Sequence, residues 1–294
     1  MFSTLPTLGI GASLSLAAEP NPVTLAQQAG GPDFIEYAGL VDAERILPEV
    51  QRIRASNTPV LFHPSYINFC GSFPNLPAWL ETTARHIEAV GSPWFAQDCA
   101  YCFWNEGFGY SSQFGYFIPP LFNQASLEQA IQRVREVQAL VPVPVAIEPP
   151  PLTFVAGNMH LLAFFGELAK QTGCGILLDM GHLLSYQMAS GRSVFESIED
   201  FPLEHVIEVH IAGGKIKPGD DGPVYIDAHE NPIVDEVWQM LDAWLPRLNN
   251  IKALCYECEG ADETTVLETL ARLRRLVGSK STSASLVAKA EKKL

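Results

Sequence analysis

Basic residues are scarce in this sequence. Lys and Arg together number 19 against 33 Asp and Glu, so the formal net charge is −14 at pH 7. Proteins bind nucleic acids and anionic membranes through clusters of Lys and Arg that displace counterions from phosphate groups. Because the basic residues here are spread along the chain, we expect neither nucleic acid nor a membrane as a partner.

Long apolar runs are also missing. No stretch approaches the roughly 18 uninterrupted apolar residues that a membrane-spanning helix needs. The first twenty residues are apolar, but they lack the basic segment of a secretory signal and contain Pro6, Gly9 and Gly11. We therefore interpret residues 7–16 as a first strand and expect a cytoplasmic protein.

The six cysteines do not form a convincing zinc module. There are two Cys-x-x-Cys pairs, Cys99 with Cys102 and Cys255 with Cys258, a spacing that is typical of structural zinc ligands. The second pair, however, continues an apolar strand, in which residues three apart face opposite sides. Buried reduced thiols are the favoured interpretation, and a structural zinc site is the less favoured one.

The sequence does contain a regular alternation of apolar runs of strand length with stretches of helix length. This βαβ pattern is typical of a parallel sheet. A chain of 294 residues with 47% hydrophobic residues fits two domains or one α/β barrel of about 250 residues. We see no internal repeat and no second domain. The prediction is a single (β/α)8 TIM-type barrel over residues 1–277, followed by a flexible Ser/Ala/Lys-rich tail at 278–294.

The expected strands are residues 7–16, 32–37, 59–63, 93–98, 143–148, 175–179, 206–210 and 251–257. Helices are expected near residue 23 and at 42–55, 77–90, 126–140, 159–171, 195–198, 234–245 and 263–277. The segment 99–122 is long, aromatic and contains several glycines. Insertions of this length without regular structure are usually active-site or lid loops, and a packed aromatic cover without a function is the alternative.

Six consecutive expected strands, the third to the eighth, end in a titratable side chain. These side chains are His63, Asp98, Glu148, Asp179, His210 and Glu257. The carboxyl ends of the strands in such a barrel all lie on one face, where active sites are built. We therefore expect the six side chains to converge.

Three more candidates follow two of these strands. His182 lies in the turn after Asp179, and Asp227 and His229 lie in the loop after His210. Residues i and i+2 of an extended segment face the same side, so Asp227 and His229 can point at one ion. Five carboxylates crowded together would have raised pKa values unless cations occupied the site. Nine nitrogen and oxygen ligands predict more than one metal ion, with iron, manganese or zinc as the candidates.

Each residue alone has a simpler interpretation. A lone His63 or Asp98 is more often a hydrogen-bonded core residue or a helix cap. Glu148 could simply begin the proline-rich turn that follows it, and His182 could cap the next helix. Glu36 and Glu259 could also be ligands, but supporting or surface roles are the favoured interpretation for them, and we expect His86, His160 and His205 to have structural roles.

Several motifs resemble those of the multinuclear non-heme iron-dependent oxidative enzymes, the family of the methanobactin biosynthesis enzyme. They are FHPSYINF, QDCAYC, AIEPPP, GILLDMGHLL, EVHIAGG, YIDAHENP and YECEG. The resemblance runs from about Gly9 to about Val277. It implies a TIM-type barrel that holds two or three irons (Fe2+/Fe3+) and uses dioxygen as co-substrate. The expected substrate is a ribosomally made precursor peptide of natural-product biosynthesis, in which one residue, often cysteine, is oxidised. In this family a small partner protein commonly presents the peptide.

Carried over by motif, the resemblance assigns the same nine residues as iron ligands: His63, Asp98, Glu148, Asp179, His182, His210, Asp227, His229 and Glu257. Of these, His182, His210 and Asp227 are also the predicted catalytic residues. The chain departs from the family pattern at Asp98, His182 and Gly214, where the family usually has His, Asn and His. The departures indicate a divergent member.

Two other functions stay open. A redox-neutral sugar isomerase or metal hydrolase on a xylose-isomerase-like barrel would also gather Glu, Asp and His at strand ends, and bound zinc or manganese without iron would favour it. A non-catalytic barrel that binds a partner would hold no metal tightly.

Overall fold

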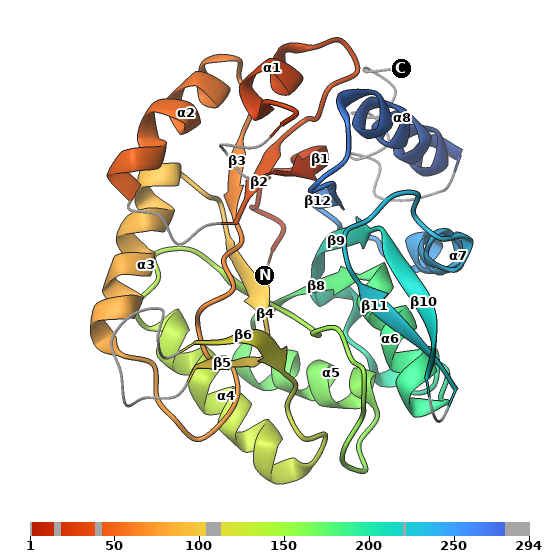
Figure 1. The fold of residues 1–294 in the computed structure, drawn as a ribbon. Coiled ribbons are helices and arrows are strands. Elements are labelled where there is room, and N and C mark those ends of the chain that lie inside the picture. The colour runs from red at the N-terminus through yellow and green to blue at the C-terminus, as the bar shows by residue number, and fades with distance from the viewer. Residues whose placement is uncertain (1, 15–18, 39–42, 104–112, 220–221, 280–294) are drawn as a thin grey trace.

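The computed structural model describes residues 2–14, 19–38, 43–103, 113–219 and 222–279. In this part of the chain, eight parallel strands close into a barrel in the order β1-β12-β9-β8-β7-β4-β3-β2. Helices surround the strands (Figure 1). The predicted (β/α)8 TIM-type barrel is therefore confirmed. None of the described helices combines the length and hydrophobicity that crossing a membrane requires.

The barrel strands are β1 (Gly9–Ser13), β2 (Ile35–Tyr37), β3 (Val60–Phe62), β4 (Phe95–Asp98), β7 (Val145–Glu148), β8 (Gly175–Asp179), β9 (Val206–Ala212) and β12 (Ala253–Glu257). The helices are α1 (Pro22–Gln27), α2 (Ala43–Ala55), α3 (Pro77–Val90), α4 (Gln124–Gln138), α5 (Leu161–Thr172), α6 (Met180–Ser190), α7 (Asp235–Trp244) and α8 (Glu263–Ser279). Pro32, Pro59 and Pro93, the predicted first residues of three strands, precede the observed strands, because proline lacks the N–H that strand pairing uses.

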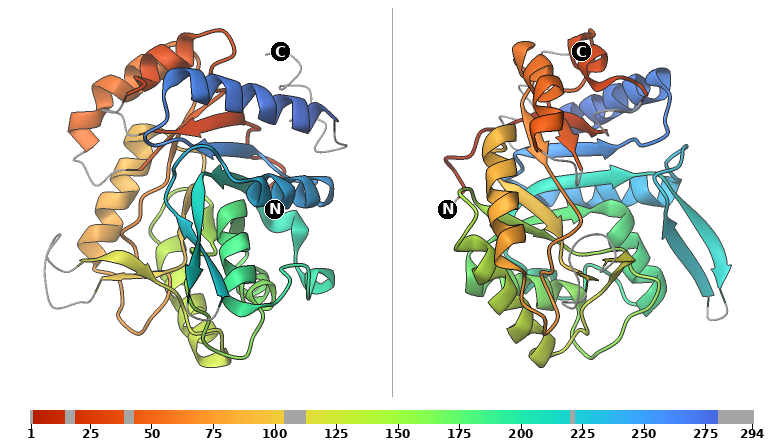
Figure 2. Two further views of the ribbon diagram at one scale, coloured as in Figure 1. Left: turned by 45° about the vertical axis from the view of Figure 1, so that its right-hand side comes forward. Right: turned by 60° about the vertical axis from the view of Figure 1, so that its left-hand side comes forward.

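Three predicted connections were wrong. The segment 99–122 contains a hairpin of β5 (Tyr101–Phe103) and β6 (Gln113–Ile118), although residues 104–112 lie outside the described chain. The expected loop before Asp227 is a hairpin of β10 (Gly214–Gly219) and β11 (Gly222–Asp227), which stands out from the barrel (Figure 2). Helix α6 replaces the helix predicted at 195–198, where a turn and a short 3-10 helix lie instead. Most of the predicted tail, residues 280–294, also lies outside the described chain.

The two ends of the barrel interior differ in polarity. The amino-terminal end is filled by an apolar plug, which we define as the buried residues Phe2, Leu8, Phe34, Leu61, Trp94, Ala96, Ala146, Leu177, Ile207, Ala253 and Cys255. The outward side chains of the same strands join the main core under the helices. Because the plug supplies apolar packing at one end, the carboxyl end of the barrel is free to hold polar side chains.

Arg274 of α8 fixes the last helix to the start of the barrel. Its side chain is 1% exposed, and its guanidinium donates to the carbonyls of Gly30 and Gly31 at 2.6 and 2.7 Å. Asp33 lies 3.7 Å from the same guanidinium. Two carbonyls and one carboxylate between α1 and β2 therefore depend on a single buried cation.

Replacing this cation should destabilise the fold. Arg274→Met leaves the two carbonyls without their charged donor, so the free energy of unfolding should fall by about 2–4 kcal/mol. Arg275→Met is the matched control. Arg275 is the exposed neighbour of Arg274, so its replacement should change the free energy of unfolding by no more than about 0.5 kcal/mol. Urea unfolding followed by circular dichroism measures both. Equal midpoints for the two variants would contradict this account of barrel closure.

Candidate metal centre

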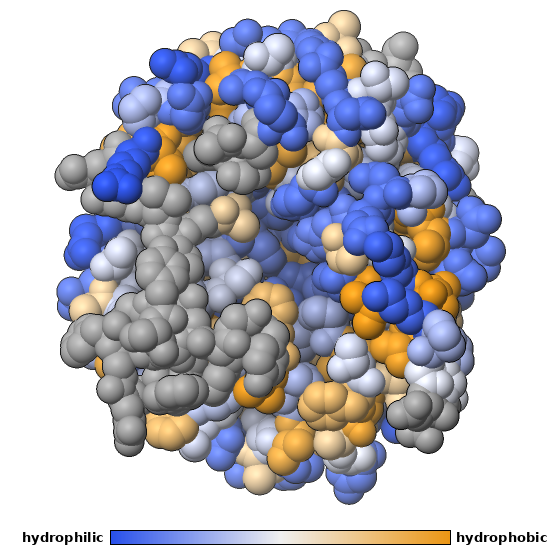
Figure 3. Space-filling view, in the orientation of Figure 1, coloured by the Kyte–Doolittle hydropathy of each residue, from blue (hydrophilic) through white to orange (hydrophobic). Residues whose placement is uncertain are grey.

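The structure brings all nine predicted ligand residues to the carboxyl end of the barrel. Strands β4, β7, β8, β9 and β12 supply Asp98, Glu148, Asp179, His210 and Glu257, and His63 follows β3 directly. These six and His182 are buried. Asp227 ends β11 and His229 follows it, with side chains that are 13% and 28% exposed. A hydrophilic hollow is visible in the middle of the molecule in Figure 3.

His182 is the hub of one half of the cluster. Its position in α6 follows from Asp179, the N-cap residue, whose Oδ1 accepts a hydrogen bond from the His182 amide at 2.7 Å. The His182 Nδ1 lies 3.1 Å from Glu148 Oε1. Its Nε2 lies 3.2 Å from Asp227 Oδ2. The predicted turn after Asp179 is thus the first turn of a helix, and the helix places the imidazole within 4.0 Å of four carboxylates, those of Asp98, Glu148, Asp179 and Asp227.

His210 is the hub of the other half. Its Nε2 lies 3.2 Å from Glu36 Oε2, and its Nδ1 lies 3.4 Å from Glu257 Oε1. His229 joins the two halves, because its Nε2 lies 3.4 Å from Asp227 Oδ2 and 3.5 Å from Glu257 Oε2. The cluster is therefore continuous.

Four overlapping groups of three residues could each hold an ion, with their ligand atoms within 4.8 Å of one another. They are Glu36–His63–His210, His63–Asp98–Glu148, Glu148–Asp179–His182 and Asp179–His210–Glu257. Each group shares members with the next, so neighbouring ions could be bridged by a common residue. Asp227 and His229 are in none of these groups and lie at the edge of the cluster.

Several donor atoms of the cluster lack partners within the protein. Within the described residues, buried atoms that have no hydrogen-bond partner include Glu36 Oε1, His63 Nδ1, Asp179 Oδ2 and Asp227 Oδ1. Native proteins rarely bury polar atoms without a partner, and an ion is one of the few explanations. Oxygen and imidazole donors left open towards a common space fit iron, manganese or zinc.

The pKa values of the cluster reflect the crowding of its buried carboxylates and imidazoles. Burial raises the pKa of Asp98 to about 7 and that of Glu36 to about 8. Burial lowers the pKa of His63 to about 4. Burial also opposes the charge on His182 and His210, but the surrounding carboxylates outweigh it and raise both pKa values well above the usual range. Without cations, the site therefore retains protons near neutral pH.

Two carboxylates of the cluster were not among the predicted ligands. Glu36 was expected to have a supporting or surface role, but it is fully buried, so the surface alternative is wrong. Glu208, also fully buried, was not considered. The sequence feature that could have identified both residues is a glutamate inside an otherwise apolar strand. Glu259 supports the cluster, because its Oε2 lies 2.8 Å from His229 Nδ1.

The other histidines have the structural roles that were expected. His86 stacks on Phe62, with ring centroids 4.3 Å apart. The His160 ring accepts from the first turn of α5, and His205 Nδ1 lies 2.8 Å from the Cys174 carbonyl. The six cysteines are buried free thiols, and the four ligand groups contain none of them.

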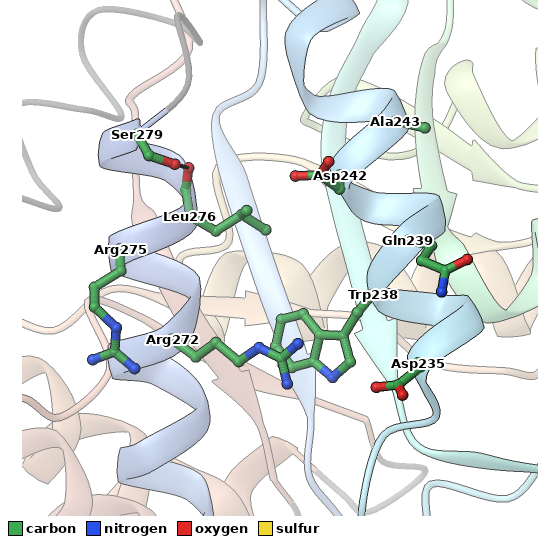
Figure 4. Close-up of a pocket in the computed structure, with 9 residues that line it drawn as sticks. All are labelled: Asp235, Trp238, Gln239, Asp242, Ala243, Arg272, Arg275, Leu276 and Ser279. Atoms are coloured by element: carbon green, nitrogen blue, oxygen red, sulfur yellow. Dashed lines mark hydrogen bonds between the residues drawn. The ribbon is translucent and has the colours of Figure 1, made fainter.

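A separate groove lies outside the barrel between α7 and α8 (Figure 4). There the guanidinium of Arg272 lies 3.6 Å from the centre of the Trp238 ring, a cation–π contact between the two helices. The groove contains none of the proposed ligands.

Gly214, one of the positions at which the motif resemblance predicts a different residue, lies against Tyr225. A Cβ at Gly214 would lie 2.3 Å from the Tyr225 hydroxyl and 2.6 Å from the Ile226 carbonyl. The Tyr225 hydroxyl is buried and has no hydrogen-bond partner among the described residues. This chain therefore has a tyrosine hydroxyl against position 214, where a larger side chain would not fit.

Gly214→Ala should therefore destabilise the chain, by about 1–3 kcal/mol for overpacking. Gly278→Ala is the control, because nothing lies within 4 Å of the place that its Cβ would take and alanine favours a helix by up to about 1 kcal/mol. Denaturant unfolding of both variants measures the difference. A Gly214→Ala protein as stable as the Gly278→Ala protein would show that Tyr225 does not restrict this position.

Metal binding should strengthen as the pH rises from 6 to 8. Asp98 and Glu36, with pKa values of about 7 and 8, are largely protonated at pH 6, and an ion that binds within the cluster must displace those protons. Calorimetric titration of the metal-free chain with Zn2+, in buffers of different ionisation enthalpy, counts those protons. Affinity that does not change over this pH range would contradict the assignment of these carboxylates.

Comparison with solved structures shows the same barrel. A D-psicose 3-epimerase with D-fructose has a TM-score of 0.58 at 13% identity, covering 92% of this chain and 100% of that one. The IOLI protein with a bound zinc atom has a TM-score of 0.60 at 11% identity, covering 92% and 98%. A xylose isomerase-like TIM barrel protein from Mycobacterium smegmatis with magnesium has a TM-score of 0.53 at 14% identity, covering 93% and 97%. At such identities the likeness shows the fold alone, and it confirms the xylose-isomerase-like barrel.

Sequence relatives are UPF0276 proteins. One from Rhizobium meliloti (strain 1021) is 34% identical over 128 residues, 42% of this chain and 41% of that protein. One from Streptomyces avermitilis is 26% identical over 243 residues, 81% of this chain and 48% of that protein. The chain thus spans less than half the length of these two relatives.

The model of one protein family matches residues 14–274, almost the whole barrel. Its description is "RiPP precursor modification enzyme MbnB/TglH/ChrH", and the resemblance inferred from the motifs is confirmed. By this match, the chain is a member of the MbnB/TglH/ChrH family of RiPP precursor modification enzymes.

Proposed function

We propose that this chain is a multinuclear non-heme iron enzyme that uses dioxygen to oxidise a residue, with cysteine favoured, of a ribosomally made precursor peptide. Family membership supports a peptide as the substrate. The single observation that supports a multinuclear metal site is the overlap of the four ligand groups. Each of His63, Glu148, Asp179 and His210 belongs to two of these groups. Shared ligands suit two or three adjacent ions better than one.

The proposed ligands are His63, Asp98, Glu148, Asp179, His182, His210, Asp227, His229 and Glu257, and Glu36 lies in the same cluster. Imidazole and carboxylate donors without cysteine suit iron. Bound iron in the Fe2+ and Fe3+ states would supply redox chemistry, with dioxygen as the oxidant.

His182, His210 and Asp227 are the proposed catalytic residues. Asp227 is half-buried at the mouth of the cluster, where a peptide side chain would arrive, and hydrogen bonds from His182 and His229 outweigh its burial and lower its pKa to about 2. Asp227 therefore stays ionised and can orient a cationic or proton-donating group. His229 has a φ of 50°, a left-handed conformation that costs a non-glycine residue about 1–2 kcal/mol. Such strain is typical of residues held in place for function.

Aromatic and apolar side chains around the mouth would exclude water and receive the peptide. Phe73 and Tyr101 stack with ring centroids 5.9 Å apart beside β5. Leu121 and Phe154, on the segments after β6 and β7, are 52% and 55% exposed. Exposed apolar groups of this kind are typical of docking surfaces, so they support the peptide, and a small protein that presents it, as partners.

The test is anaerobic loading of the metal-free chain with Fe2+, elemental analysis, and then exposure to oxygen with the short peptides encoded beside its gene. We expect two or three irons per chain, oxygen consumption and a change in the mass of one peptide. Asp179→Asn should lose at least one iron, because it removes a carboxylate shared by two groups while keeping an N-cap residue for α6. His205→Gln, at a histidine outside the cluster, should keep the full iron content.

Three results would contradict the proposal. Iron content of one or less per chain would exclude the multinuclear site. Equal iron loss in Asp179→Asn and His205→Gln would show that the loss does not report on the cluster. Full activity on a ketose with zinc or manganese, without oxygen consumption, would favour the sugar isomerase alternative.

A further inference from the structure

Glu208 is a charged residue buried in the barrel beside the apolar plug. It lies on β9, is fully buried and is two residues before His210. A carboxylate in such surroundings costs free energy unless donors compensate it. It is not among the nine proposed ligands and belongs to none of the four ligand groups.

A shift in strand register turns Glu208 into the barrel. Ile176 of β8 pairs with Val206, but the next residue, Leu177, pairs with Glu208. Ile207 is therefore an extra residue on β9, as in a β-bulge, and it packs in the plug with Leu177. Bulges next to active sites re-aim side chains. After this one, Glu208 and His210 both face the interior.

Glu208 has one hydrogen-bond donor, Trp94, and its Oε1 is a buried atom without a hydrogen-bond partner among the described residues. Its Oε2 accepts a hydrogen bond from Trp94 Nε1 at 2.7 Å. Its Oε1 lies 3.6 Å from His210 Nε2, and Glu36 Oε2 lies 3.2 Å from the same nitrogen. Because Trp94 is 1% exposed and packed in the plug, its N–H holds one carboxylate oxygen in place and leaves the other turned towards His210.

The two nitrogens of His210 therefore have different surroundings. Nε2 faces two carboxylates, Glu36 and Glu208, which favour a proton on it. Nδ1 lies 3.4 Å from Glu257 Oε1 and has no hydrogen-bond partner among the described residues. A histidine that binds a metal typically donates its other N–H to a carboxylate, which sets the tautomer and the ring orientation.

We propose that Glu208 is a positioning residue, which together with Trp94 and Glu36 keeps a proton on His210 Nε2 so that Nδ1 binds an ion shared with Asp179 and Glu257. This inference rests on the proposed metal centre and specifies which nitrogen of His210 binds the ion. A nitrogen that keeps its proton cannot bind an ion. The group Glu36–His63–His210 is then not an ion site, and Glu36 is a hydrogen-bond acceptor instead of a ligand.

The test uses Zn2+, which is diamagnetic, with the full chain carrying 15N-labelled histidine. Two-bond 15N–1H correlation spectra show which nitrogen of each of the seven histidines is protonated, and the His210→Gln spectrum identifies the His210 signals. In the wild-type chain we expect a protonated Nε2 and a zinc-bound Nδ1. In Glu208→Gln we expect this pattern to be lost and the affinity for zinc to fall by about 10–100-fold.

Trp94→Phe keeps an aromatic, apolar side chain but removes the N–H, so it should shift the His210 signals in the same direction. Tyr66→Phe is the control, because it removes another buried hydrogen bond, 2.8 Å from the Tyr66 hydroxyl to Thr83 of α3, and neither residue belongs to the four ligand groups. It should leave the His210 signals and the zinc affinity unchanged. Circular dichroism melts check that each variant is folded.

Zinc bound through His210 Nε2 in the wild-type chain would overturn the inference while leaving the proposed metal centre standing. An unchanged tautomer and affinity in Glu208→Gln would overturn it as well. A wild-type chain that binds neither zinc nor iron would instead contradict the metal centre itself, and the inference with it.

Discussion

Repulsion among buried carboxylates is the constraint on which the rest of this structure depends. Asp98, Glu148, Asp179 and Glu257 meet at one end of the barrel with almost no exposure to water. Burying a charge costs several kcal/mol per group unless an opposite charge compensates it. In the metal-free chain, protons and imidazolium groups provide that compensation, which explains the raised pKa values of Asp98 and of His182. Divalent or trivalent ions would provide it better, because one ion can contact several carboxylates at once.

The barrel can hold such a cluster because one end of its interior is apolar and the other is polar. The apolar plug and the helices packed around the strands supply the hydrophobic stabilisation. The carboxyl ends of the strands are left for polar groups. On β9 the interior changes from apolar to polar between Ile207, in the plug, and His210, in the cluster. Glu208 lies between these two residues. Glu208 is thus held by the N–H of Trp94, between the apolar plug and the residues of the candidate metal centre.

The same barrel occurs in proteins of very different description, among them a D-psicose 3-epimerase and a zinc-bound IOLI protein. A shared fold does not imply a shared reaction. The evidence for a reaction comes instead from the family match of this chain. In this chain the Tyr225 hydroxyl occupies the space beside Gly214, a residue that has no side chain.

The sequence by itself determined the barrel and the convergence of nine side chains at one end of it. The reason is that eight apolar runs with helices between them leave few arrangements, and parallel strands in a barrel all end on one face. Asp179, His210 and Glu257 could therefore be placed together from their positions at strand ends. Only the tertiary structure decided that the segments before Ile118 and Asp227 are hairpins, and that Glu36 and Glu208 face the cluster. Strand alternation already places Glu208 on the same side of β9 as His210, but the position of its carboxylate between Trp94 and His210 depends on the packing of separate strands, and no local pattern in the sequence records it.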